Sequence, residues 1–141
     1  MKIHDFSAIG LAMAVAACSS SGPTETTGFV APPLMTVTSQ SGQLEIAVRT
    51  SPQPPEQGTN DIELTITGAS DGVARDGLVL AVKPWMPAMG HGTSVAPTIT
   101  PETNGKYLLS GVDLFMAGLW QLRLTISGPI EDNAVPAFEI P

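Results

Sequence analysis

The sequence predicts an all-β protein, an immunoglobulin-like antiparallel β-sandwich of seven or eight strands. Apolar and polar residues alternate with a period of two in several short runs. Turn-forming residues are frequent, with 14 Gly and 13 Pro in 141 residues. No amphipathic helical pattern follows the first twenty positions. A chain of this length has room for one modest domain, and a signal peptide and a flexible tether are expected before it.

The first 18 residues, MKIHDFSAIGLAMAVAAC, are typical of a secretory leader. One lysine precedes an apolar run that is too short to cross a bilayer as a helix and that ends in small residues. The end of this run resembles a bacterial lipobox, in which the cysteine thiol is acylated and becomes the new N-terminus. We therefore expect residues 1–17 to be a lipoprotein signal peptide and Cys18 to be the lipidation site. An ordinary signal peptide with an incidental cysteine is the alternative.

The segment 18–33 is rich in Ser, Thr, Gly and Pro and contains little to bury. This composition predicts a flexible, acylated tether that holds the domain, 34–141, away from the membrane. The protein is thus expected in the bacterial cell envelope, lipid-anchored through Cys18 to a periplasmic or outer-membrane face.

The first strands of the domain are half-buried. Residues 43–50 and 61–67 each place apolar side chains on one face and polar ones on the other. Residues 77–84 are apolar on both faces, which is typical of a central strand that ends at Pro84. Further strands are expected at 95–100, 106–109, 112–116, 119–127 and 134–140.

Charge and cysteine content exclude several classes of function. Removing the leader takes one base, Lys2, from the 6 and one acid, Asp5, from the 13, so the net charge stays at −7. Such a surface repels phosphates, and nucleic acid is not an expected partner. The single cysteine excludes an internal disulfide. Glu131 and Asp132 are interpreted as solvated turn residues.

The stretch WMPAMGHG, residues 85–92, combines side chains that can bind a soft metal ion. Thioether sulfur is a soft ligand for Cu(I), and the neutral imidazole ring complements it near neutral pH. Met86, Met89 and His91 therefore form a candidate metal site, because the intervening Pro and Gly residues favour a compact loop.

Two neighbouring features complete the candidate site. Met116 precedes another expected strand, and the loops of a sandwich gather at its ends, so this residue is the candidate fourth ligand. Trp85 or Trp120 could cover the metal through a cation–π contact. The alternative is that the methionines fill gaps in the core while His91 is solvated.

Other sites have less support. A blue-copper centre needs two histidines and a cysteine, and zinc needs similar ligands, which the chain lacks after Cys18. A hydrolase would depend on His91 as its base, and the chain contains no G-x-S-x-G motif.

Four segments together resemble the YtkA-like family of small secreted or membrane-anchored bacterial domains. They cover about residues 53–140 and read PPEQGTNDIELTITG, WMPAMGHG, GKYLLSGVDLFMAGLW and AFEI. The second is close to the family's MP-x-M loop, and the third resembles its G-x-Y and M-x-G-x-W patterns. The resemblance implies an immunoglobulin-like sandwich at the outer face of a membrane. Similar FixH-like proteins are linked with copper supply to respiratory oxidases; these carry a transmembrane helix, whereas this chain is expected to be lipid-anchored.

The function expected from these features is that of a non-enzymatic envelope lipoprotein that binds Cu(I) as a chaperone or buffer. The alternative is an interaction module whose apolar loop docks onto an envelope protein partner without any metal.

Overall fold

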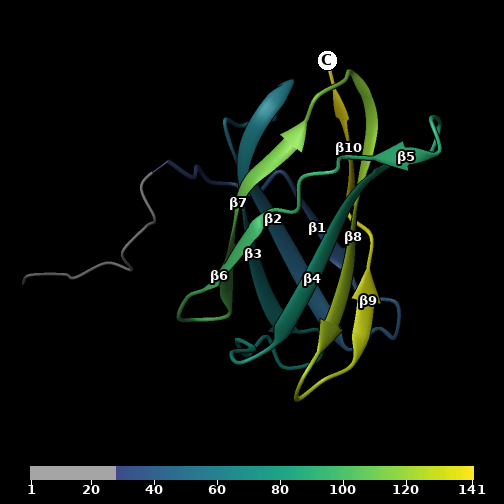
Figure 1. Ribbon diagram of the computed structural model, residues 1–141. Coiled ribbons are helices and arrows are strands. Elements are labelled where there is room, and N and C mark those ends of the chain that lie inside the picture. Colours follow the sequence, from purple (N-terminus) through teal and green to yellow (C-terminus); the bar gives the residue numbers. More distant parts are fainter. Residues whose placement is uncertain (1–27) are drawn as a thin grey trace, which may run out of the picture.

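Two antiparallel β-sheets pack face to face in the computed structural model, which describes residues 28–141 (Figure 1). The predicted all-β sandwich is confirmed. The predicted signal peptide and Cys18 lie outside the described residues. Within the described range, none of the elements is a helix that could span a membrane.

The first sheet has five strands in the order β1-β2-β3-β7-β6. Its central strands are long and carry the alternation seen in the sequence. In this order the strands are β1 (Met35–Thr38), β2 (Leu44–Ser51), β3 (Gly58–Gly68), β7 (Lys106–Leu114) and β6 (Thr98–Pro101).

The second sheet follows the order β10-β8-β4-β5, and a further short strand, β9, also pairs with β8. Its two long strands lie side by side through most of their length. The strands are β10 (Ala137–Ile140), β8 (Gly118–Ser127), β4 (Val79–Met86), β5 (His91–Gly92) and β9 (Asp132–Ala134).

The hydrophobic core fills the space between the sheets. Alternate residues of each long strand are almost fully buried, and each large side chain removed from water contributes roughly 1.5–3 kcal/mol. Those with the least exposure include Leu44, Ile46, Ile62, Leu64, Ile66, Leu109, Leu114, Trp120, Leu122, Leu124 and Ile126.

The described chain forms ten strands, and the extra ones relative to the expected seven or eight are short. The structure also joins the predicted strands 106–109 and 112–116 into one, β7. A β-bulge explains why the sequence pattern breaks there, since Asn60 pairs with Val112 while Ile62 pairs with Leu109. Two residues of β7 thus oppose one residue of β3, and Gly111 supplies the positive φ of 71° that this geometry favours.

The packed part of the chain begins before the predicted boundary at residue 34. Phe29, which the composition assigned to the tether, is buried, and Gly28 lies against Ser51 at the end of β2. A single aromatic side chain among Pro and Gly residues leaves no periodic signal, which is why the sequence did not place it in the domain.

Candidate functional site

The β4–β5 hairpin brings two of the four candidate ligands opposite each other. Met86 and His91 are cross-strand partners in the antiparallel register. The N–H groups of Met89 and Gly90 both donate to the carbonyl of Met86, at 3.2 and 3.0 Å, and Gly90 supplies a φ of 67°. Direct partners in a ladder project side chains on the same face, so Met86 and His91 face the same side.

The turn between β7 and β8 lies against this hairpin. The rings of His91 and Phe115 stack with centroids 6.0 Å apart and an interplanar angle of 13°. Phe115 in turn packs against Trp120 in a T-shaped arrangement, with ring centroids 5.5 Å apart. The indole N–H of Trp120 donates to the carbonyl of Met116 at 2.9 Å, which fixes the turn to the core. We call residues 86–92 and 115–118 together the hairpin end.

Burial differs sharply among the four candidate ligands. Met86 is 3% exposed, and its methyl group would lie 3.2 Å from a Cβ at Gly118. Met116 is half-buried and packs against the core. Met89 is 51% exposed at the tip of the hairpin, and His91 is exposed beside Phe115. The fold therefore gathers all four at one end of the sandwich, two toward the core and two toward solvent.

Neither Trp85 nor Trp120 covers the four candidate ligands. Trp85 precedes Met86 in β4 and so projects from the outer face of the sheet. Lys83 Nζ and the Arg123 guanidinium each lie 4.7 Å from its ring centroid. Trp120 is completely buried behind Phe115. Phe115, which the sequence analysis did not select, is the aromatic ring that lies against His91.

The chemistry of the donors limits the metals that this end could hold. Within residues 28–141, no group of three or more His, Cys, Asp or Glu side chains is placed to hold a metal ion. A metal at the hairpin end would therefore depend on thioether sulfur together with one imidazole. Such a soft, uncharged set fits Cu(I) and does not fit Mg²⁺, Ca²⁺ or a structural Zn²⁺.

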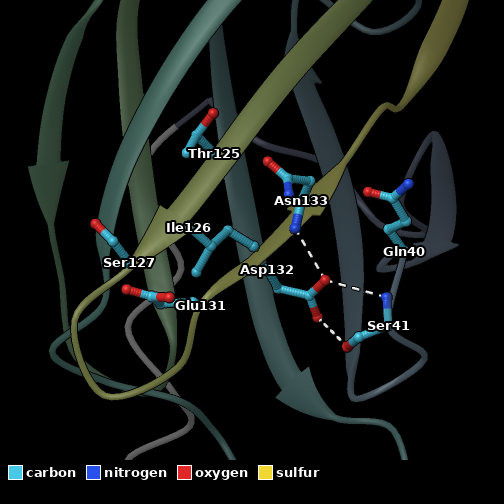
Figure 2. A pocket seen from close by; sticks show the side chains of 8 residues that line it. All are labelled: Gln40, Ser41, Thr125, Ile126, Ser127, Glu131, Asp132 and Asn133. Atoms are coloured by element: carbon cyan, nitrogen blue, oxygen red, sulfur yellow. Dashed lines mark hydrogen bonds between the residues drawn. The ribbon is translucent and has the colours of Figure 1, made fainter.

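An open pocket of about 520 Å³ lies at the opposite end of the sandwich (Figure 2). Asp132 lines it but points toward the β1–β2 loop. The backbone N–H groups of Ser41 and Asn133 donate to Oδ1, and the Ser41 hydroxyl donates to Oδ2. Asp132 is 6% exposed, so its interpretation as a solvated turn residue was wrong.

These contacts change the acidity of Asp132. Burial acts to raise the pKa of this carboxyl, but hydrogen bonds from Ser39, Ser41 and Asn133 outweigh it and lower the pKa from 3.8 to about 2. The carboxylate already has donors on both oxygens. It therefore connects the first sheet to β9 of the second. We call Asp132 and its partners Ser39, Ser41 and Asn133 the Asp132 clasp.

Comparison with known protein families identifies a match over most of the described chain. The YtkA-like family model matches residues 38–125, from the end of β1 to most of β8. The chain belongs to the YtkA-like family. No curated protein and no solved structure matches it.

Two of the segments on which the resemblance rested, G-x-Y and M-x-G-x-W, make specific backbone contacts in the structure. In G-x-Y, the Tyr107 hydroxyl accepts from Leu78 N–H at 3.0 Å and donates to the Arg75 carbonyl at 2.7 Å. Gly105 has a φ of 71°, and a Cβ there would lie 2.5 Å from the carbonyl oxygen of Ile66.

The second motif, M-x-G-x-W, shapes the turn of the hairpin end. Its glycine, Gly118, has a φ of 124°, and its tryptophan donates to the carbonyl of its methionine. In this YtkA-like chain, both motifs therefore hold the backbone of turns. The side chains of Met89 and His91 have no comparable role in packing, since both are exposed.

Proposed function

We propose that this protein is a non-enzymatic lipoprotein of the bacterial cell envelope, anchored through Cys18, whose YtkA-like domain binds Cu(I) at the hairpin end. The ion is cargo that the protein buffers or passes on. The observation that carries the proposal is the register pair of Met86 and His91, which sets a thioether and an imidazole side by side on one face.

The other side chains of the hairpin end complete the proposal. Met89 and His91 are exposed and so are the donors that a Cu(I) ion from solvent would meet first. Met86 and Met116 lie deeper and could supply further thioethers. Phe115 covers one side of the imidazole and limits the access of water to it. The exposed pair leaves a path for the ion to be transferred to an acceptor.

Titration with Cu(I) against a chromogenic competitor tests this proposal. We expect His91→Ala and Met89→Leu to weaken the Kd by at least about tenfold each, because each removes a donor that the core does not hold. Leucine keeps the volume of methionine and removes the sulfur. Met35→Leu, in β1, is the matched control and should bind as the unaltered chain does. Equal, weak binding by all of these proteins would contradict the proposal.

Lipid attachment has its own test. Cells grown with radiolabelled palmitate should label the unaltered protein, and the label should be lost in Cys18→Ser. Equal labelling of both proteins would contradict the anchor without affecting the copper proposal.

A role as an interaction module is the second candidate. The exposed surfaces of Met89 and Phe115, 51% and 42%, form an apolar tip of the kind found in protein interfaces. A photo-crosslinking residue at position 115 should then capture one envelope protein equally well with and without copper. Capture that requires copper would instead favour the first candidate.

A further inference from the structure

Two cationic side chains on the second sheet have no acidic partner, unlike the others in the described part of the chain. Arg49 and Lys106 pair with Glu63, and Arg75 pairs with Asp71. Lys83 and Arg123 form no ion pair within residues 28–141 and are both exposed. They stand out on a protein whose net charge is −7.

The fold holds these two cations close together. Lys83 and Arg123 are direct cross-strand partners in β4 and β8, and both project from the outer face. Each lies 4.7 Å from the centroid of the Trp85 ring, so they can be no farther apart than twice that distance. Like charges directly opposite each other destabilise a sheet. A bound anionic group would relieve this repulsion, and the ring offsets part of it in the free protein.

The same strand also has an unpaired edge. β4 pairs with β8 from Val79 to Trp85, but with β5 only at Trp85 and Met86. Among the described strands, residues 79–83 therefore have a neighbour on one side only, because β5 already lies against Pro84. Lys83 and Pro84 are residue types that proteins place on edges to prevent indiscriminate strand pairing.

The backbone groups open at this edge can be assigned. The carbonyl of Met86 points to the side of β5, because it accepts hydrogen bonds from the two N–H groups of the hairpin loop. Direction repeats every two residues in a strand, so the N–H and C=O groups of Leu80 and Val82 point to the same side. Pro84 has no N–H to offer. The edge thus presents two complete sets of hydrogen-bonding groups beside a pair of cations.

We propose that β4 binds an extended acidic segment of a partner protein, which adds as a strand along residues 79–83 and places carboxylates at Lys83 and Arg123. An outer sheet face with Trp, Arg and Lys beside a free edge fits a peptide chain. Two cations are too few to bind a membrane surface, for which clusters of about 4–8 basic residues are typical. They are also too few to bind nucleic acid on a protein whose net charge is negative. The binding is independent of copper.

A labelled ten-residue peptide of alternating Glu and Val, titrated into the full chain and followed by fluorescence anisotropy, tests this proposal. We expect saturable binding that weakens with salt. Peptides with Gln or Lys in place of Glu should bind at least about tenfold more weakly. The double variant Lys83→Gln/Arg123→Gln should lower the affinity for the acidic peptide by a similar factor. Arg75→Gln is the control, because it removes a half-buried cation that is paired with Asp71, away from β4.

Amide hydrogen exchange locates the peptide. Exchange at Leu80 and Val82 should slow in the complex, because strand addition protects those N–H groups. Thermal unfolding of the double variant checks that it is folded. Equal peptide binding by the double variant and the Arg75→Gln control, unchanged exchange at β4, or stronger binding to phosphatidylglycerol vesicles than to the peptide would each overturn the proposal.

Discussion

At the scale of single residues, buried polar groups differ in whether they have a partner. The Tyr107 hydroxyl joins two backbone groups across the sandwich, and burial raises the pKa of this phenol, which keeps it protonated as a donor. The hydroxyl of Thr50 is equally buried but has no hydrogen-bond partner among the described residues. The hydrogen-bonded Tyr107 hydroxyl stabilises the fold, whereas burial of the unpaired Thr50 hydroxyl lowers the free energy of unfolding.

Paired substitutions test this difference. Tyr107→Phe keeps the ring but leaves the Leu78 N–H without an acceptor, so we expect a loss of about 1–3 kcal/mol in the free energy of unfolding. Thr50→Val removes an unpaired hydroxyl at nearly constant volume and should leave stability unchanged or raise it. Urea unfolding monitored by circular dichroism measures both. An equal loss in the two variants would show that the Tyr107 bonds contribute nothing specific.

The sequence predicted the chemistry of the candidate site better than its surroundings. Met86, Met89, His91 and Met116 could be selected by residue type and do lie at one end of the sandwich. Trp85 does not join them, and the alternation of the strand already separates neighbouring residues onto opposite faces. Phe115 could not be found from the sequence, because its contact with His91 depends on how the β4–β5 hairpin meets the β7–β8 turn, which connects the two sheets.

At the scale of elements, β5 is a two-residue strand that holds the exposed donors in place. Gly92 permits this pairing, because a Cβ there would lie 2.1 Å from the carbonyl oxygen of Pro84. The ring of Trp85 lies over the same position. A small residue is therefore required at the point where β5 meets β4.

Gly92→Ala should consequently open the β4–β5 hairpin without unfolding the domain. We expect faster amide hydrogen exchange at Met89 and Gly90, whose N–H groups donate to Met86, and a small change in the midpoint of thermal unfolding. The reason is that the loop and β5 contribute no side chain to the core. Ala88→Ser, in the same loop, is the control and should leave exchange unaltered. Slow exchange at both amides in Gly92→Ala would contradict the assigned constraint.

The long strands were predictable because their alternation reports burial directly, whereas the short ones were not. β9 has three residues and β5 has two, too few for a period to be recognised. Within β7 the bulge shifts the alternation, so one strand reads as two.

At the scale of the whole molecule, the two sheets are fastened together at the end opposite the hairpin end. The Asp132 clasp connects the β1–β2 loop to β9, and the Gln40 N–H donates to the Asn133 carbonyl at 2.7 Å beside it. Residues 41 and 132 are far apart in the sequence, which contains no local signal for this contact.

The clasp makes stability depend on pH. Folding lowers the pKa of Asp132 from 3.8 to about 2, so the folded chain favours the ionised carboxylate. The contribution, on the order of 2 kcal/mol, is complete above the unfolded pKa and is lost as the pH falls from about 4 through about 2. Urea unfolding between pH 6 and 2 should show this loss, and Asp132→Asn should be less stable at pH 6 and less sensitive to pH in that window. An equal pH dependence in both proteins would contradict the assignment.

The described chain enters the sandwich at the end that carries the hairpin. Gly28 lies beside Ser51, and thus at the end of the molecule that carries the hairpin. Ten residue steps from Cys18 to Gly28 reach at most about 35 Å. Under the proposed attachment at Cys18, the chain coming from the bilayer would reach the domain at the same end as Met89 and His91. If the domain also binds Cu(I) as proposed, an acceptor embedded in that membrane would be within reach of the hairpin end.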